Sequence, residues 1–200
     1  MPDLRRSLTM DNFTVLAIPL AESSDAIQAF RKQHVHRPAV AMPPHISIQY
    51  PFYPVEEISE MVQLKLQAIA ASHLPISYSL SGFGVFPQAK VLYLEPIPSE
   101  PFLLLYETIK KTFPDLKSAF DPPTMHLTIA HAEAAVSLEA LKMNFLDHEG
   151  INLPVQAKAE SLDLYEKKNG VWNRISEYKN ANKSVVATAD NVCSSLRSGR

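Results

Sequence analysis

The 200-residue sequence contains a single cysteine, Cys193. A disulfide within the chain needs two cysteines and is therefore impossible. The CxxC pairs typical of thiol redox centres and of many zinc sites are absent as well. These absences argue against a thiol redox enzyme and against a cysteine-rich zinc protein.

Long apolar runs are also missing. No stretch approaches the roughly 20 apolar residues that a membrane-spanning helix needs. The N-terminus, MPDLRRSLTMDNF, carries two arginines, but no apolar run behind them is long enough for a signal peptide. We therefore expect a soluble cytoplasmic protein with no membrane partner, and the sequence gives no sign of an obligatory protein partner.

The chain has no excess of positive charge, since 19 basic and 21 acidic residues leave a net charge of −2. Proteins that bind nucleic acid through counterion release are usually basic overall. Any nucleic acid is therefore expected to be held locally rather than along a basic track. Walker and dinucleotide-binding patterns are absent, and Gly-Phe-Gly at 82–84 is too short to form a phosphate loop.

Hydrophobic periodicity predicts an α+β fold, because segments with strand periodicity and segments with helix periodicity both recur along the chain. The predicted strands are 13–20, 45–52, 76–83, 90–97, one opening at 126, and a closing hairpin over 159–178. The predicted helices are 24–34, 56–71, 100–113 and 137–147. GVFPQA (84–89) is expected to form a turn, and Asn169-Gly170 favours a type I′ turn in the hairpin.

The predicted elements fall into two similar halves. Each half runs strand, helix, histidine strand, helix, strand. Corresponding positions are separated by 78 residues at the first strands, 81 at the histidines and 79 at the last strands. These near-constant offsets indicate an internal duplication, and hence two related α+β lobes facing each other.

The two histidine strands carry HISIQY (45–50) and HLTIAH (126–131). Residues two apart on a strand point to the same side. His45 and Ser47 therefore share one face, and His126 and Thr128 share another. By composition roughly one His-x-[Ser/Thr] arises by chance, and requiring apolar neighbours lowers this to roughly 0.2. One such motif could be a hydrogen-bonded core histidine, whereas two at matching places favour a functional site.

Two histidines and two hydroxyls suit phosphodiester chemistry without a metal. Imidazole titrates near pH 6.5, so one ring can accept a proton while the other donates one. The hydroxyls of Ser47 and Thr128 could stabilise the charge that develops on phosphoryl oxygens. No carboxylate cluster that could hold a metal lies near either motif, so we expect no metal and no cofactor.

The pair HISI (45–48) and HLTI (126–129) resembles the two H-x-[T/S]-x signatures of the two-histidine (2H) phosphoesterase superfamily. PPHISIQYPF, GFGVFPQAKVLYLEP and the NGVW hairpin resemble its 2′-5′ RNA ligase-like, or cyclic phosphodiesterase, branch. The resemblance covers residues 12–180 and leaves 181–200, a polar segment expected to be a flexible C-terminal tail. Ser47 stands where many members carry threonine, which keeps the hydroxyl.

The resemblance implies a bilobal duplicated fold in which each lobe has an antiparallel sheet and helices, with an active cleft between the lobes. It implies that His45 and His126 are the acid and base, in an order left open, and that Ser47 and Thr128 bind the phosphate. The implied substrates are 2′,3′-cyclic phosphates or 2′–5′ linkages of RNA or nucleotides, with ligation as the possible reverse reaction.

Three further residues are weaker candidates for contact with an RNA end or a nucleotide. Tyr50 and Phe86 are aromatic residues near strand ends that could stack on a base. His131 would face away from His126 on a regular strand and could reach the substrate only if the chain bends. His34 and His36 with Arg37 could form an anion-attracting loop, and Trp172 is expected to pack on a sheet face.

Two other functional classes stay open. The fold could serve as a non-catalytic module that binds an RNA end or a nucleotide, although binding alone does not need two titratable rings. A histidine-ligated metalloenzyme is the third alternative, and bound zinc or iron would support it.

Overall fold

The computed structural model describes residues 13–20, 24–35, 42–133 and 136–180. The expected tail at 181–200 lies outside these residues, and so do His36 and Arg37 of the expected anion-attracting loop. His34, the third residue of that loop, instead ends the helix Ser24–His34. None of the described helices is both long and apolar enough to cross a membrane.

The described strands form two antiparallel sheets of four. One sheet has the strand order β2-β1-β7-β8 and the other β5-β4-β3-β6. The strands are β1 (Thr14–Pro19), β2 (His45–Gln49), β3 (Ile76–Phe86), β4 (Val91–Ile97), β5 (Leu127–His131), β6 (Val155–Ala159), β7 (Ser161–Lys168) and β8 (Val171–Lys179). The α+β class and the two antiparallel lobes are therefore confirmed.

The two sheets do not coincide with the two halves of the sequence. Strand β3 comes from the first half, yet it pairs with β4 of the second, with Phe83 opposite Leu94. Strand β7 comes from the second half, yet it pairs with β1, with Leu164 opposite Leu16. The last strand of each half therefore lies in the sheet of the other half. This exchange joins the two lobes both through the chain itself and through ladder hydrogen bonds.

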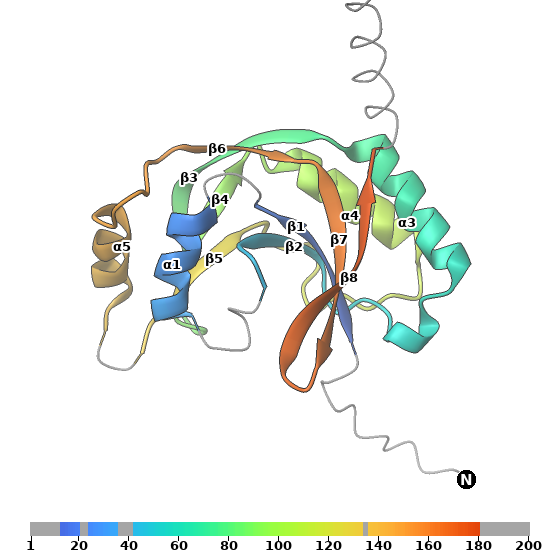
Figure 1. Cartoon of the computed structure of the whole chain (residues 1–200), viewed down its shortest axis with the longest axis horizontal. Coiled ribbons are helices and arrows are strands. Elements are labelled where there is room, and N and C mark those ends of the chain that lie inside the picture. Colours follow the sequence, from blue (N-terminus) through green and yellow to red (C-terminus); the bar gives the residue numbers. More distant parts are fainter. Residues whose placement is uncertain (1–12, 21–23, 36–41, 134–135, 181–200) are drawn as a thin grey trace, which may run out of the picture.

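The helices follow a similar exchange. They are α1 (Ser24–His34), α3 (Glu60–His73), α4 (Glu100–Thr112) and α5 (Leu138–Leu146), with a 3-10 turn at Val55–Glu57. Helix α1 follows β1 in the chain but lies against β5, and α4 follows β4 but lies against β2. Figure 1 shows α1 and α5 at one end of the molecule and α3 and α4 at the other.

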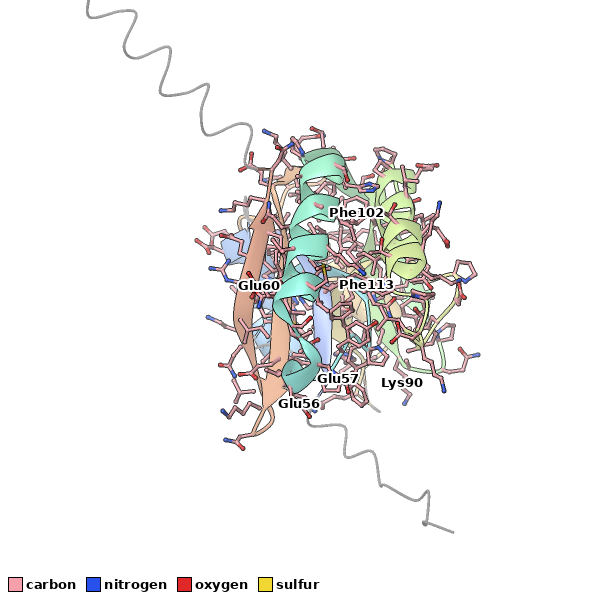
Figure 2. The ribbon with its side chains drawn as sticks, turned by 90° about the vertical axis from the view of Figure 1, so that its right-hand side faces the viewer. Glu56, Glu57, Glu60, Lys90, Phe102 and Phe113 are labelled. Carbon is pink, nitrogen blue, oxygen red and sulfur yellow. The ribbon has the colours of Figure 1, made fainter. Side chains whose placement is uncertain are left out.

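One hydrophobic core runs behind both sheets. It takes alternate residues from the strands, such as Leu16 and Ile18 of β1 and Leu92 and Leu94 of β4. Helices α3 and α4 lie side by side over it in Figure 2, and the rings of Phe102 and Phe113 are buried in it. Because alternate strand residues enter this core, the residues between them are left for the opposite face.

Strand β6 was not predicted, and three predicted boundaries are wrong. The strand expected at 45–52 ends at Gln49. The helix expected at 56–71 begins at Glu60, because the Ser59 hydroxyl accepts a hydrogen bond from the Val62 amide at 3.3 Å and caps it there. The turn expected at 84–89 is shorter, because β3 continues to Phe86, which pairs with Val91. Pro87, which has no amide hydrogen for the ladder, follows directly. Phe86 is consequently a strand residue with a fixed facing.

Candidate active site

The two histidine motifs have the predicted alternation. Ile46 and Ile48 of the first motif, and Leu127 and Ile129 of the second, lie in the core. Each motif therefore turns its histidine and hydroxyl to the face opposite the core, where His45, Ser47, His126 and Thr128 are all half-buried. We call this shared surface the histidine face.

The fold brings the two motifs together. Strands β2 and β5 are each the edge strand of their sheet, and these two edges lie next to each other. The rings of His45 and His126 are close enough for the charge of His126 to lower the pKa of His45. Residues 81 positions apart in the sequence thus form one site at the junction of the sheets.

Both imidazoles are held in the same way. His45 Nδ1 lies 2.8 Å from the carbonyl oxygen of Pro43, and His126 Nδ1 lies 2.7 Å from that of Thr124. A carbonyl oxygen can only accept, so Nδ1 must carry the proton in each ring. The neutral rings therefore present Nε2 as a proton acceptor, which is the atom that acid–base chemistry requires.

The two histidines differ in acidity. Burial, followed by the charges of Arg31 and His126, lowers the pKa of His45 to about 4, although the bond to Pro43 opposes them. Burial also lowers the pKa of His126, and the bond to Thr124 opposes that effect. Desolvation penalises a charged imidazole, so both rings favour the neutral form, and an anionic ligand would shift them back toward the charged form.

A β-bulge turns His131 toward the histidine face. Ala130 pairs with Leu92 and Thr128 pairs with Tyr93, so Ile129 is an extra residue in β5. His131 consequently pairs with Val91, and cross-strand partners lie on the same side of a sheet. Val91 and Tyr93 are two apart on β4 and share the side of Thr128, so His131 lies on that side too.

The first motif has the matching bulge, between Leu16 and Ala17 of β1. Its sixth residue, Tyr50, packs against a small apolar cluster that includes Ala17 and Tyr165. Ala17 pairs with Ser47 across the sheet, so this cluster belongs to the histidine face. Each six-residue motif therefore supplies three side chains to the face rather than two.

An aromatic pair flanks His126. The Phe86 ring meets the His126 ring edge-on, at a centroid distance of 4.9 Å, and lies 4.5 Å from the Tyr93 ring. Tyr93 itself is 5.1 Å from His126 and lies over Gly84, where a β-carbon would come within 2.2 Å of it. Sequence reasoning missed Tyr93, because only the β3–β4 register shows that a glycine makes room for it.

A second aromatic pair lies on the Ser47 side. The Tyr50 and Trp172 rings are 6.3 Å apart, and both pack on the cluster that contains Tyr165. The expected packing of Trp172 on a sheet face is thus confirmed. Beside it, the fully buried Asp163 accepts a hydrogen bond from Arg174 at 3.1 Å, a contact that the sequence pattern did not indicate.

Among the described residues, no group of three histidine, cysteine or acidic side chains is arranged to hold a metal ion. The groups that the histidine face offers include the imidazoles of His45 and His126, with His131 at the end of β5, two hydroxyls and two aromatic pairs. Such a set can move protons and donate hydrogen bonds to an anion.

Residues 19–170 match the model of the 2′-5′ RNA ligase superfamily. The chain belongs to this family. The resemblance to two-histidine phosphoesterases that rested on HISI and HLTI is therefore confirmed, over most of the chain.

Bacterial relatives are similar along nearly their whole length. A protein of Geobacillus kaustophilus named "Putative phosphoesterase" is 26% identical over 183 residues, which are 87% of this chain and 99% of the relative. A protein of Bacillus pumilus with the same name is 27% identical over 173 residues, covering 80% of this chain and 92% of the relative.

Solved structures share the fold. The structure of TT0787 from Thermus thermophilus aligns with a TM-score of 0.56 and 19% identity, over 84% of this chain and 97% of that one. Escherichia coli LigT in complex with 3′-AMP aligns with a TM-score of 0.54 and 17% identity, over the same shares of the two chains. At these identities the likeness concerns the fold.

Proposed function

We propose that this protein is a metal-independent phosphoesterase that opens 2′,3′-cyclic phosphates or cleaves 2′–5′ linkages of RNA or nucleotides. The observation that carries the proposal is the matched hydrogen bonding of His45 and His126. Each ring donates Nδ1–H to a backbone carbonyl and leaves Nε2 on the histidine face. Two such nitrogens beside two hydroxyls suit acid and base placed on either side of a phosphorus atom.

The proposed reaction needs one neutral and one protonated ring. The neutral Nε2 takes a proton from water, whose oxygen then forms a bond to phosphorus. The bond from phosphorus to the ribose oxygen breaks, and the protonated Nε2 of the other ring gives its proton to that oxygen. The hydroxyls of Ser47 and Thr128 donate hydrogen bonds to the non-bridging oxygens, where negative charge increases. With an alcohol as nucleophile, the same steps in reverse join two ends.

The aromatic pairs support a nucleotide substrate. Phe86 on Tyr93 lies beside His126, and Tyr50 with Trp172 lies beyond Ser47. A base stacked on such a ring gains about 1–3 kcal/mol. E. coli LigT, which shares the fold, binds 3′-AMP. We infer that bases stack on these side chains while the phosphate lies between the two histidines, with His131 able to reach it from the second bulge.

The experiment that tests the function is incubation of the purified protein, in EDTA, with a short RNA that ends in a 2′,3′-cyclic phosphate. The wild type should open the ring, and His45→Ala and His126→Ala should each lose at least about a hundredfold in rate. His73→Ala is the matched control, because His73 ends α3 and lies outside both motifs. The position of the product phosphate identifies the leaving oxygen.

A second substrate separates the alternatives. If the cyclic phosphate does not react, the same variants are tested on a 2′–5′-linked dinucleotide beside its 3′–5′ isomer. Tight binding of both substrates without turnover would refute catalysis and support the binding module. Turnover that EDTA abolishes and one added metal restores would refute the metal-independent mechanism.

A further inference from the structure

Arg31 of α1 is a buried cation at the junction of the two histidine motifs. Its side chain is 2% exposed, although it belongs to neither motif. Its Nε donates to the backbone carbonyl of Thr128 at 3.0 Å, and one terminal nitrogen donates to that of Met42 at 3.2 Å. The same nitrogen donates to the Gln28 side-chain oxygen at 2.7 Å, which fixes the guanidinium from its own helix.

These two carbonyls belong to the two segments of the chain that carry the histidine motifs. Thr128 is itself a motif residue on β5, and Met42 precedes His45 by three residues. Because β2 and β5 are the edges of separate sheets, the ladder hydrogen bonds of either sheet do not join them. A planar guanidinium has several donors in a fixed geometry and can donate hydrogen bonds to both segments at once. Arg31 thus bridges the two segments that carry the motifs.

The charge of Arg31 acts unequally on the two histidines. Burial lowers the pKa of Arg31 to about 10, so it stays protonated at neutral pH. In the described part of the chain, the charged or titratable groups that act on His45 are Arg31 from α1 and His126, which directly precedes β5, and both disfavour the His45 cation. The pKa of His126 is lowered by burial and raised by the hydrogen bond to the Thr124 carbonyl. The two motifs are alike, but this electrostatic environment is not.

We propose that Arg31 is a positioning residue that divides the roles of the two histidines, keeping His45 neutral as the general base and leaving His126 as the general acid. This assignment rests on the proposed phosphoesterase function for its chemical meaning. The unequal protonation of the two rings does not, since it is a property of the ligand-free protein.

The test begins without substrate. The two imidazoles are titrated by NMR in the wild type, with His45→Ala and His126→Ala used to assign the signals. His45 should titrate at lower pH than His126. Arg31→Met removes the charge and keeps an apolar side chain of similar length, and it should shift the His45 titration to higher pH more than that of His126. Arg31→Lys keeps the charge and should leave the His45 titration near the wild-type position.

Activity supplies the second measurement. In the pH profile of kcat/KM, the acid limb reports the free base, so Arg31→Met should move it to higher pH while Arg31→Lys should not. An activity loss with an unmoved acid limb would mean that Arg31 is only structural and would overturn the proposal. His45 titrating at or above His126 in the wild type would also overturn it, even if the neutral variant fails to fold. Absence of activity with the expected NMR titrations would instead refute the phosphoesterase function alone.

Discussion

Replacing Gly84 with alanine should damage the protein in a way that Gly82→Ala does not. Both glycines lie on β3, two residues apart and on the same side of the sheet. A β-carbon on Gly84 would lie 2.2 Å from two carbons of the Tyr93 ring, whereas one on Gly82 would lie 3.0 Å from the terminal oxygen of Glu95. The first contact needs a shift of more than 1 Å by a buried ring, and the second needs a small rotation of a flexible side chain.

The difference in free energy follows from these contacts. Overpacking a well-packed site costs about 1–3 kcal/mol, and alanine in place of a strand glycine recovers roughly 0.5–1 kcal/mol of backbone entropy. Gly84→Ala should therefore lower the free energy of unfolding by up to about 2.5 kcal/mol. Gly82→Ala should change it by less than about 1 kcal/mol in either direction. Since Tyr93 packs on Phe86 and His126, the first variant should also displace both rings.

Urea unfolding of both variants beside the wild type measures the stabilities, and the His126 imidazole signals in NMR report the displacement. The wild-type m-value should be retained, since the unfolded surface is nearly unchanged. Equal stabilities of the two alanine variants would refute the reasoning, as would an unaltered His126 signal in Gly84→Ala. Either result would mean that the Tyr93 ring does not occupy the space over Gly84.

Two other expectations concern the site itself. The lowered pKa of His45 means that protonation is less favourable in the folded state, so stability is full above the unfolded pKa of about 6.5 and falls as pH drops toward 4. Between pH 7.5 and 5 this loss of stability should reach up to about 2 kcal/mol. His45→Asn, which can keep the bond to Pro43, should flatten that part of a curve of stability against pH measured by urea unfolding. Parallel curves for the variant and the wild type would contradict this expectation. Phe86→Ala should lower kcat/KM for a nucleotide substrate about tenfold by loss of stacking, whereas Phe86→Tyr should keep a kcat/KM near that of the wild type. Equal losses for the two variants in steady-state assays would argue against stacking.

The facing of the histidines was predictable from the sequence because it depends on local rules. Alternation along a strand places His45 with Ser47, and the isoleucines between them mark the opposite side as core. The near-constant offsets between the halves predicted that the second motif repeats the first. The α+β class and the two antiparallel lobes follow from the same periodicities together with the family resemblance.

The pairing of distant segments was not predictable in this way. Nothing local to Ile129 indicates that it is an extra residue opposite β4, yet that bulge decides which way His131 points. Likewise the room for Tyr93 depends on which glycine of β3 lies across from it. The exchange of β3 and β7 between the halves is a property of register, which is set when the strands pair and not by either strand alone.

The duplication explains why the site has two equivalent histidines, but acid–base catalysis needs two that differ. The hydrogen bonds from Nδ1 are the same in both motifs, so they cannot provide that difference. The helices that cover the motifs can. Helix α1 places the buried cation of Arg31 against the junction, whereas the buried face of its counterpart α4 consists of Phe102, Leu105, Tyr106 and Ile109. Under the role proposed for Arg31, a single charged residue on one of two related helices breaks the chemical symmetry of the two histidines.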